Sequence, residues 1–515
     1  MAGEFFTGVD AAWFRMDRPG NLAQIAGVMI FDTPIDRSRL IELVQQRLLV
    51  YDRFRQRVRE PLLGLGLPRW EFDPHFDLNY HLPQISLPDP GSQVELQQRV
   101  GDLMGQPLDR AHPLWQIYYI ENYQGGCALV PRLHHCIADG LALVQVLLAL
   151  TDPQPDVSVF QRPTRPDRAA TSRSGFAPLR PLTRLIDTTT AVARTATREA
   201  LLSVTEPARV TQAASLGALG LNAAGKLLLL SPDQKTIING SCRVEKRVAW
   251  SAAIPLGDVI RAGRALRSTV NDVLLATATG ALRRYMEQRG QDVTGVNIRT
   301  MVPVSIRAAK DLNKLGNQFG LVIVSLPIGV RDPLLRLQVL KQRMDDIKDT
   351  PEAQVAFGIL GVMGRTPRQI EKVIIDIFAA KVSAVMTNVP GPRKPIYLAG
   401  QRLNSLMFWV PRGGDIGLGL SILSYAGNVY IGIATDAGLM PDPQAIVDAY
   451  HAELADLLRL ASPARSTLSP IKRPSANGQC RAVTKAGVPC RNRALPDSPY
   501  CAVHTKRLQP ATQLE

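Results

Sequence analysis

The chain contains 515 residues, of which 45% are hydrophobic and 20% charged, and its formal net charge is +15. This length exceeds that of an average domain, so two large domains or two fused halves are expected. The composition excludes a membrane-spanning protein, because the most apolar stretch, residues 216–230, is shorter than the roughly 20 residues of a spanning helix and contains Asn222 and Lys226. Any membrane contact should therefore be peripheral.

The positive charge is concentrated in two segments. Residues 161–240 contain eleven Lys and Arg against five Asp and Glu, and residues 463–515 contain nine against two. The rest of the chain is close to neutral, so the basicity belongs to a linker and a tail. Anionic lipid surfaces or the phosphates of a small ligand suit this distribution better than a nucleic-acid duplex, and no nucleic-acid partner is expected.

The first residues lack the basic and apolar regions of a secretory signal peptide, which predicts a cytoplasmic protein. Three of the six cysteines are scattered in apolar surroundings and three cluster near the end of the chain. This pattern is not that of a disulfide framework.

Residues 1–160 alternate helical and strand patterns. Ser38–Leu49 has the apolar spacing of an amphipathic helix, whereas Gln116–Glu121 and Cys127–Leu133 have the patterns of strands. The alternation predicts a layered α/β or α+β domain.

Residues 161–240 are expected to form a basic linker. The chain is rich in Pro, Asp, Arg and Ser around residues 151–175, which is typical of a loop. Apolar residues then recur near helical spacing at 182–200, with arginines among them. This amphipathic helix could pack between two domains or lie on a membrane surface.

Residues 241–462 form the second expected domain, with helices predicted at Thr269–Tyr285 and Asp442–Leu458. Strand patterns occur at Val296–Val304, Gly320–Leu326, Ala384–Asn388, Ile416–Leu423 and Asn428–Ala434. This region is expected to be a second α/β half.

Two adjacent histidines, His134 and His135, follow the strand expected at Cys127–Leu133, and Gly140 opens an apolar segment with the pattern of a helix. A neutral imidazole near a bound alcohol can take its proton during attack on an acyl carbonyl. Asp139 can brace the loop, and Gly140 leaves the backbone without a Cβ where a substrate or strand must approach. These residues are therefore the candidate catalytic group.

The run His134–Gly140 resembles the HHxxxDG motif of the bacterial wax ester synthase/diacylglycerol acyltransferase family, a motif shared with other CoA-dependent acyltransferases and with peptide-synthetase condensation domains. Further blocks resemble this family in the expected order: His112–Trp115, Asn271–Ala276, Val302–Arg307, Gly316–Gly320, Thr387–Pro392 and Leu423–Gly427. The resemblance spans about residues 5–460. The family's opening PMHVG block is replaced here by Asn21–Gly27, which leaves the lining of the acyl pocket open.

The resemblance implies a chloramphenicol-acetyltransferase-like fold, with two similar halves and an active-site tunnel between them. It implies that His135 deprotonates an alcohol, which attacks the acyl-CoA thioester directly. Arg307 is the expected partner of Asp139. Asn271 and Asp272 could either cap a helix or support the site.

The function expected from this resemblance is transfer of a long-chain acyl group from acyl-CoA to diacylglycerol or a long-chain alcohol, at a membrane or lipid-droplet surface and without a catalytic cofactor. Three alternatives stay open: a nucleophilic Cys136, an amide-forming condensation enzyme, and a non-catalytic lipid-surface protein. The blocks Pro113–Trp115 and Thr387–Pro392 could be packing and connecting residues or could line the site.

Residues 463–515 are expected to be an appended basic tail. Its segment 476–508 contains Cys480, Cys490, Cys501 and His504, separated by nine, ten and two residues. Three thiols and an imidazole suit a structural zinc ion, which would serve folding rather than catalysis. Unligated thiols are the alternative, because the first gaps are longer than in a usual zinc knuckle. The segment resembles a small Cys/His module that occurs on assorted bacterial proteins.

Overall fold

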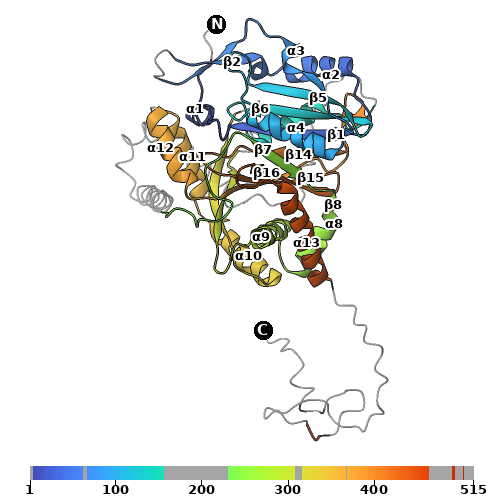
Figure 1. Cartoon of the computed structure of the whole chain (residues 1–515), viewed down its shortest axis with the longest axis vertical. Helices are drawn as coiled ribbons and strands as arrows, with labels where there is room; N and C mark the ends of the chain where they lie inside the picture. Colours follow the sequence, from blue (N-terminus) through green and yellow to red (C-terminus); the bar gives the residue numbers. More distant parts are fainter. Residues whose placement is uncertain are drawn as a thin grey trace, which may run out of the picture. The chain divides into compact units, whose positions relative to one another are not determined.

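Two mixed sheets with helices packed on them make up the larger part of the computed structural model (Figure 1). The structure describes residues 4–61, 66–155, 230–307, 316–348, 350–366, 368–462, 490–492, 501 and 503. Its contacts divide the chain into two units, Met1–Ser462 and Pro463–Glu515. The helix expected at residues 182–200 lies outside the described residues.

The first sheet has the order β14-β1-β6-β5-β4 among the described strands. Its members are β1 (Gln24–Phe31), β4 (Gln84–Ser86), β5 (Trp115–Tyr123), β6 (Gly126–His134) and β14 (Ser405–Trp409). The pairs around β1 and β6 are antiparallel, and β4 runs parallel to β5. An edge strand of this sheet thus comes from the C-terminal part of the chain, a pairing that the sequence analysis did not predict.

Helices and short elements surround this sheet. They are α1 (Gly8–Arg15), α2 (Arg37–Leu43), η1 (Val44–Leu48), η2 (Asp52–Arg55), β2 (Gln56–Arg59), β3 (Arg69–Phe72), α3 (Leu78–His81), α4 (Gln93–Gly105) and α5 (Gly140–Leu150). The helix expected at Ser38–Leu49 is confirmed as α2 continued by the wider turn of η1. The strands expected at Gln116–Glu121 and Cys127–Leu133 are confirmed as β5 and β6.

The second sheet has the order β10-β9-β11-β15-β16-β7, with β8 paired to β16. Its strands are β7 (Lys246–Trp250), β8 (Ile254–Pro255), β9 (Ile298–Ser305), β10 (Phe319–Leu326), β11 (Ala384–Pro390), β15 (Leu418–Tyr425) and β16 (Asn428–Asp436). The five strand patterns predicted in residues 241–462 are all confirmed, as β9, β10, β11, β15 and β16.

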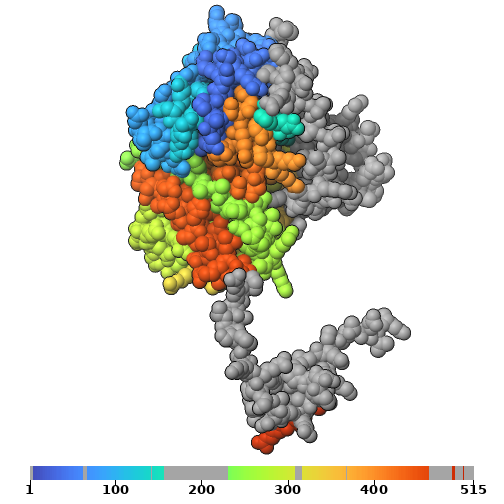
Figure 2. Space-filling model, turned by 90° about the vertical axis from the view of Figure 1, so that its right-hand side faces the viewer, coloured from blue at the N-terminus to red at the C-terminus, as the bar shows by residue number. Residues whose placement is uncertain are grey.

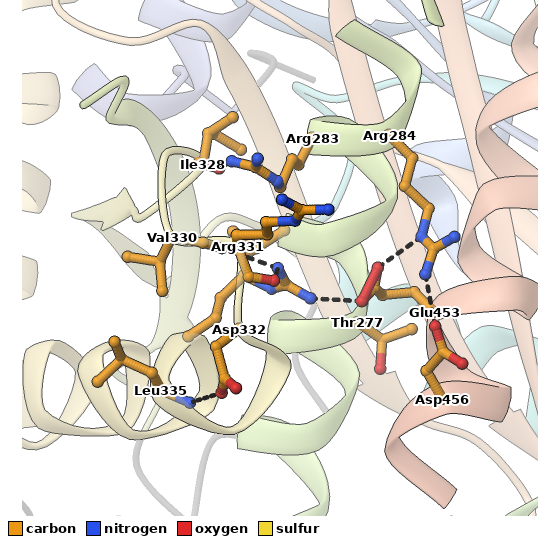
Figure 3. Close-up of polar contacts among 12 residues, drawn as sticks. Thr277, Arg283, Arg284, Ile328, Val330, Arg331, Asp332, Leu335, Glu453 and Asp456 are labelled. Carbon is orange, nitrogen blue, oxygen red and sulfur yellow. Dashed lines mark hydrogen bonds and ion pairs between the residues drawn. The ribbon is translucent and has the colours of Figure 1, made fainter. Parts of the chain in front are cut away.

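The helices of this part are α8 (Leu256–Ala265), α9 (Val270–Gln288), α10 (Pro333–Lys348), α11 (Glu352–Met363), α12 (Arg368–Ala379) and α13 (Pro443–Ala461). Both predicted helices are confirmed, as α9 and α13. An ionic network joins three of the helices: the buried Glu453 of α13 pairs with the buried Arg336 of α10 and with the partly exposed Arg284 of α9 (Figure 3). Gly280 makes room for this carboxylate, since a Cβ there would lie 2.4 Å from it.

Two contacts tie the N-terminal residues to the C-terminal ones. Helices α1 and α11 cross at glycines, where a Cβ on Gly364 would lie 1.7 Å from the carbonyl oxygen of Gly8. The segment of β12 (Tyr397–Leu398) and β13 (Gln401–Arg402) lies against the N-terminal residues (Figure 2), where Tyr397 exchanges backbone hydrogen bonds with Asp152. A shared core can therefore form between the two sheets, with α1 and α11 beside it.

Candidate active site

His135 lies directly after β6, and two hydrogen bonds hold its backbone. Its N–H donates to the carbonyl of Ala23 at 2.8 Å, and its carbonyl accepts from Nδ2 of Asn317 at 2.9 Å. The imidazole stacks on Trp13 with ring centroids 4.2 Å apart, and Phe319 lies 5.4 Å away. Residues that are about 300 positions apart in the sequence therefore hold His135 in place.

The imidazole of His135 is only 4% exposed, and no protein partner for its Nδ1 exists in the described part of the chain. Burial lowers the pKa of His135 to about 4, and the negative charge of Asp139 opposes this shift only in part. The ring is therefore neutral at pH 7, which is the form a general base requires.

A cavity of about 390 Å³ reaches His135. Alternate residues of three neighbouring strands form one wall: Met301, Pro303 and Ser305 of β9, Phe319, Leu321 and Ile323 of β10, and Val385, Thr387 and Val389 of β11. Helices α11 and α12 line another wall, and Trp13, His135, Asp139 and Gly140 come from the N-terminal part. The cavity is predominantly apolar and takes its lining from both parts of the chain.

A second apolar cavity of about 160 Å³ lies beside the first and is lined by β1, β6, α5 and η1 among other elements. The two share Gly140, Val389, Phe408 and Val410 as lining residues. Apart from the adjacent residues and the backbone of α5, no atom of the described residues lies within 4 Å of the position that a Cβ on Gly140 would take. A larger side chain at this residue would therefore project into open space between the cavities. Residues 25–27, from the segment that departs from the family pattern, line the second cavity.

The carboxylate of Asp139 makes three short contacts. Its Oδ1 accepts from the N–H of Ala142 and caps α5, whereas its Oδ2 accepts from the N–H of Gln318 and pairs with Nη2 of Arg307 at 2.6 Å. Arg307 also donates to the carbonyl of Gly316. The expected partnership of Arg307 and Asp139 is thus present, and it joins the loop after β6 to the loop between β9 and β10.

His134 is turned toward a different group. Its Nδ1 accepts from the N–H of Cys136, and its Nε2 lies 3.2 Å from Oδ2 of Asp17. Burial raises the pKa of Asp17, but the hydrogen bond and charge of His134, the N–H of Ala23 and the charge of Arg110 together outweigh this effect and bring the pKa to about 2. His134 and Cys136 are not among the described residues that line the cavity, and burial raises the pKa of the Cys136 thiol well above its usual value. This placement favours a supporting role for His134 and disfavours a Cys136 nucleophile.

Asp272 and Asn271, which the sequence analysis left between capping and site support, have separate contacts. The Asp272 carboxylate accepts from the N–H of Thr269 in a capping box at the start of α9, and no cavity contact of Asp272 is seen in the described structure. Asn271 accepts from Nδ2 of Asn388, which lines the cavity beside Thr387. Asp272 is therefore a helix cap, whereas Asn271 orients a residue of the cavity wall.

Thr387 is a polar residue of the cavity wall, from the block Thr387–Pro392 that could, from the sequence, either connect the two halves or line the site. Its side chain is 3% exposed and lines the cavity, and its Oγ1 has no hydrogen-bond partner among the described residues. A buried hydroxyl without a partner is costly unless a ligand satisfies it. The strand pattern could have indicated which face Thr387 occupies, but not that its hydroxyl is unsatisfied.

Two of the four expected zinc ligands, Cys480 and His504, lie outside the described residues. Cys490 and Cys501 are buried, and Nδ2 of Asn492 donates to Sγ of Cys501 at 3.7 Å. Within the described residues, no group of three or more potential ligand residues is arranged to hold a metal ion. Likewise, none of the described helices combines the length and apolar character needed to cross a bilayer.

Two family models match this chain. The wax ester synthase/diacylglycerol acyltransferase catalytic domain matches residues 6–274, and the C-terminal domain of the same family matches residues 315–458. The chain belongs to the wax ester synthase/diacylglycerol acyltransferase family. The family expected from the sequence motifs is therefore confirmed.

Relatives of this family align with most of the chain. A probable diacylglycerol O-acyltransferase of Mycobacterium tuberculosis, tgs1, is 31% identical over 467 residues, which cover 88% of this chain and 96% of the relative. A putative diacylglycerol O-acyltransferase of the same organism is 28% identical over 484 residues, which cover 89% of this chain and 90% of the relative.

Solved structures share the fold. The wax ester synthase/diacylglycerol acyltransferase of Marinobacter aquaeolei VT8 superposes with a TM-score of 0.62 at 20% identity, covering 89% of this chain and 99% of that one. The first condensation domain of the calcium-dependent antibiotic synthetase gives 0.56 at 14% identity, covering 90% and 96%. The expected layered α/β fold of the acyltransferase and condensation-domain type is thereby confirmed.

Proposed function

We propose that this enzyme transfers a long-chain acyl group from acyl-CoA to the hydroxyl of diacylglycerol or of a long-chain alcohol, with His135 as general base. One observation carries the proposal: a neutral, buried imidazole opens on an apolar cavity that both parts of the chain line. The names of the relatives supply the reaction class, and the apolar walls suit lipid substrates.

The imidazole of His135 takes the hydroxyl proton as the acceptor oxygen attacks the thioester carbonyl carbon. A tetrahedral intermediate forms, with negative charge on the former carbonyl oxygen. Its collapse re-forms the carbonyl, breaks the carbon–sulfur bond and returns the proton from His135 to the CoA sulfur. One base serves both proton transfers, so no acyl-enzyme is required.

Thr387 is the proposed donor to the oxyanion. Its hydroxyl lines the cavity that His135 lines, and no protein group satisfies it in the described structure. A hydrogen-bond donor that is already in place in an apolar cavity stabilises a substrate oxygen most strongly when negative charge develops on that oxygen. Asn271 supports this wall by holding the neighbouring Asn388.

Asp139 acts as a positioning residue in this mechanism. Its carboxylate is committed to Arg307, Gln318 and Ala142, so it holds the loop that carries His135 rather than accepting the proton. We propose that His134 assists in the same way through Asp17, and that Gly140 leaves space for an acyl chain between the two cavities.

Substitution of the base tests the proposal. The activity of His135→Ala with palmitoyl-CoA and either a diacylglycerol or hexadecanol is expected to fall by about 10²–10⁴-fold. His75→Ala, which changes an exposed histidine, serves as the control. Wild-type turnover by a folded His135→Ala protein with both acceptors would overturn the assignment.

For the tail we propose a structural zinc ion held by Cys480, Cys490, Cys501 and His504. The burial of Cys490 and Cys501 supports this proposal. Elemental analysis of the full chain is expected to find zinc that the double variant Cys490→Ser/Cys501→Ser lacks, and zinc-free wild-type protein would contradict it.

A further inference from the structure

Helix α12 exposes an apolar stripe to the surface. Ile370, Val373 and Ile377 are 51%, 56% and 45% exposed. Their spacing of three and four residues places them on one face of the helix. Val362, in the last turn of the neighbouring α11, is exposed as well. Isolated exposed apolar residues are ordinary, but a row of them along one helix indicates a binding surface.

The opposite face of α12 lines the cavity that contains His135. Ile375, Phe378 and Ala379 all contribute to its wall. Among the described elements, the helix lies at one side of the larger unit, beside α11 and α1 (Figure 1). A single helix therefore separates the candidate active site from the exposed stripe.

Exposed basic residues gather at the N-terminal end of α12. Arg365, Arg368 and Lys372 are exposed. The exposed carboxylate of Asp376 is neutralised by Arg18 at 2.5 Å, and Glu371 is buried on the inner face. A helix with an exposed apolar stripe and basic residues at one end is complementary to an anionic lipid surface.

We propose that α12 docks this enzyme on an anionic lipid surface, with Ile370, Val373 and Ile377 inserted among the lipid chains. In this orientation the wall of the cavity faces the lipid phase, where an apolar acceptor and the ester product partition. The proposal rests on the function proposed above, because docking next to the cavity is useful only to an enzyme that takes its substrates from a lipid phase.

Vesicle flotation of the full chain tests the docking helix. The triple variant Ile370→Ser/Val373→Ser/Ile377→Ser is expected to have an affinity for vesicles of phosphatidylcholine and phosphatidylglycerol that is at least about tenfold lower than that of wild type. The matched control is Val94→Ser/Leu335→Ser, which removes apolar side chains of 68% and 50% exposure from α4 and α10. The control is expected to bind as wild type does.

The basic residues at the N-terminal end of α12 have their own test. Arg368→Gln/Lys372→Gln is expected to bind vesicles that contain phosphatidylglycerol only as weakly as it binds pure phosphatidylcholine vesicles, to which its binding should equal that of wild type. Stronger binding to the phosphatidylglycerol vesicles, at the wild-type level, would contradict the proposed role of these residues. High salt should reduce the binding of wild type to the level of this variant.

Activity separates failure of this proposal from failure of the proposed function. With short-chain acyl-CoA and a water-soluble alcohol, the triple variant is expected to retain the wild-type rate, whereas its rate on diacylglycerol in vesicles falls. Wild-type vesicle binding by the triple variant would overturn the docking proposal whether or not the enzyme transfers acyl groups. A loss of thermal stability together with both activities would also overturn it, because the stripe would then be covered by protein.

Discussion

Nη2 of Arg307 lies 2.6 Å from Oδ2 of Asp139, and both side chains are buried. The pair connects the loop that carries His135 to the loop that follows β9. Removing one partner of a buried ion pair leaves the other charge without compensation, which typically costs about 3–5 kcal/mol.

Arg307→Ala is therefore expected to lower the free energy of unfolding by about 3–5 kcal/mol and to reduce kcat, because His135 loses its support. In Arg307→Met/Asp139→Asn no charge stays buried, so stability should partly recover while kcat stays low. Thermal unfolding and steady-state kinetics measure both effects. Recovery of kcat together with stability in the double variant would show that the pair serves folding alone.

The pH profile should reflect the low pKa of His135. An imidazole with a pKa of about 4 stays neutral, and so remains a base, down to about pH 5. We expect kcat/KM to hold its value through pH 6.5, where an ordinary histidine loses half of its activity, and to fall only as pH approaches 4. An acidic limb centred near 6.5 in the profile of kcat/KM would contradict a buried, desolvated base.

Thr387→Val should separate catalysis from stability. Valine has the shape of threonine without the unsatisfied hydroxyl, so the protein should be as stable as wild type or more stable. Loss of an oxyanion donor should nevertheless lower kcat by about 10²–10³-fold. Thr387→Ser retains the hydroxyl and should restore most of the rate. Equal activity of the valine and threonine proteins would exclude this donor.

Gly140→Val should alter the preference for acyl-chain length. The new side chain would project into the space between the two cavities, where the described residues leave room for it. We expect kcat/KM for palmitoyl-CoA to fall at least about tenfold relative to that for butyryl-CoA, because valine adds three carbon atoms and a single methylene in an apolar pocket already changes kcat/KM by about tenfold or more. Gly358→Ala, at an exposed glycine of α11, is the control. An unchanged ratio would place the acyl chain elsewhere.

Glu371 makes stability dependent on pH. Burial raises the pKa of this carboxyl to about 7, against the partial compensation by Arg15 at 3.8 Å. The unfolded chain ionises near pH 4.5 and the folded chain near 7, so wild type loses stability as pH rises through this window, by roughly 3 kcal/mol in total. Glu371→Gln avoids this loss. Its Tm should exceed that of wild type by a margin that grows from pH 4.5 to pH 7, and a constant margin would contradict the assignment.

Local patterns predicted much of the fold and of the site. The alternation of apolar residues located β9, β10, β11, β15 and β16, and the motif residues His135, Asp139 and Arg307 lie together in the structure. These features depend on residues close in sequence or on recurrent motifs, so they can be read from the chain itself.

Features that depend on distant contacts were not predicted. The pairing of β14 with β1, the stacking of Trp13 on His135 and the bond from Asn317 to the His135 carbonyl join residues that no local pattern relates. The unsatisfied hydroxyl of Thr387 is likewise a property of the whole environment. The periodicity of a strand indicates which face of the sheet a side chain occupies, but the packing of distant residues determines whether the side chain finds a hydrogen-bond partner on that face.

The origin of β14 has a consequence for biosynthesis. The ribosome completes β1 early and delivers residues 405–409 on the order of tens of seconds later, at about 5–20 residues per second. Throughout this interval the nascent chain carries an open β edge, which invites association with neighbouring chains. An N-terminal half produced on its own should consequently aggregate. Fusing Ser405–Trp409 to it would cover the open edge of β1 and should reduce the aggregation.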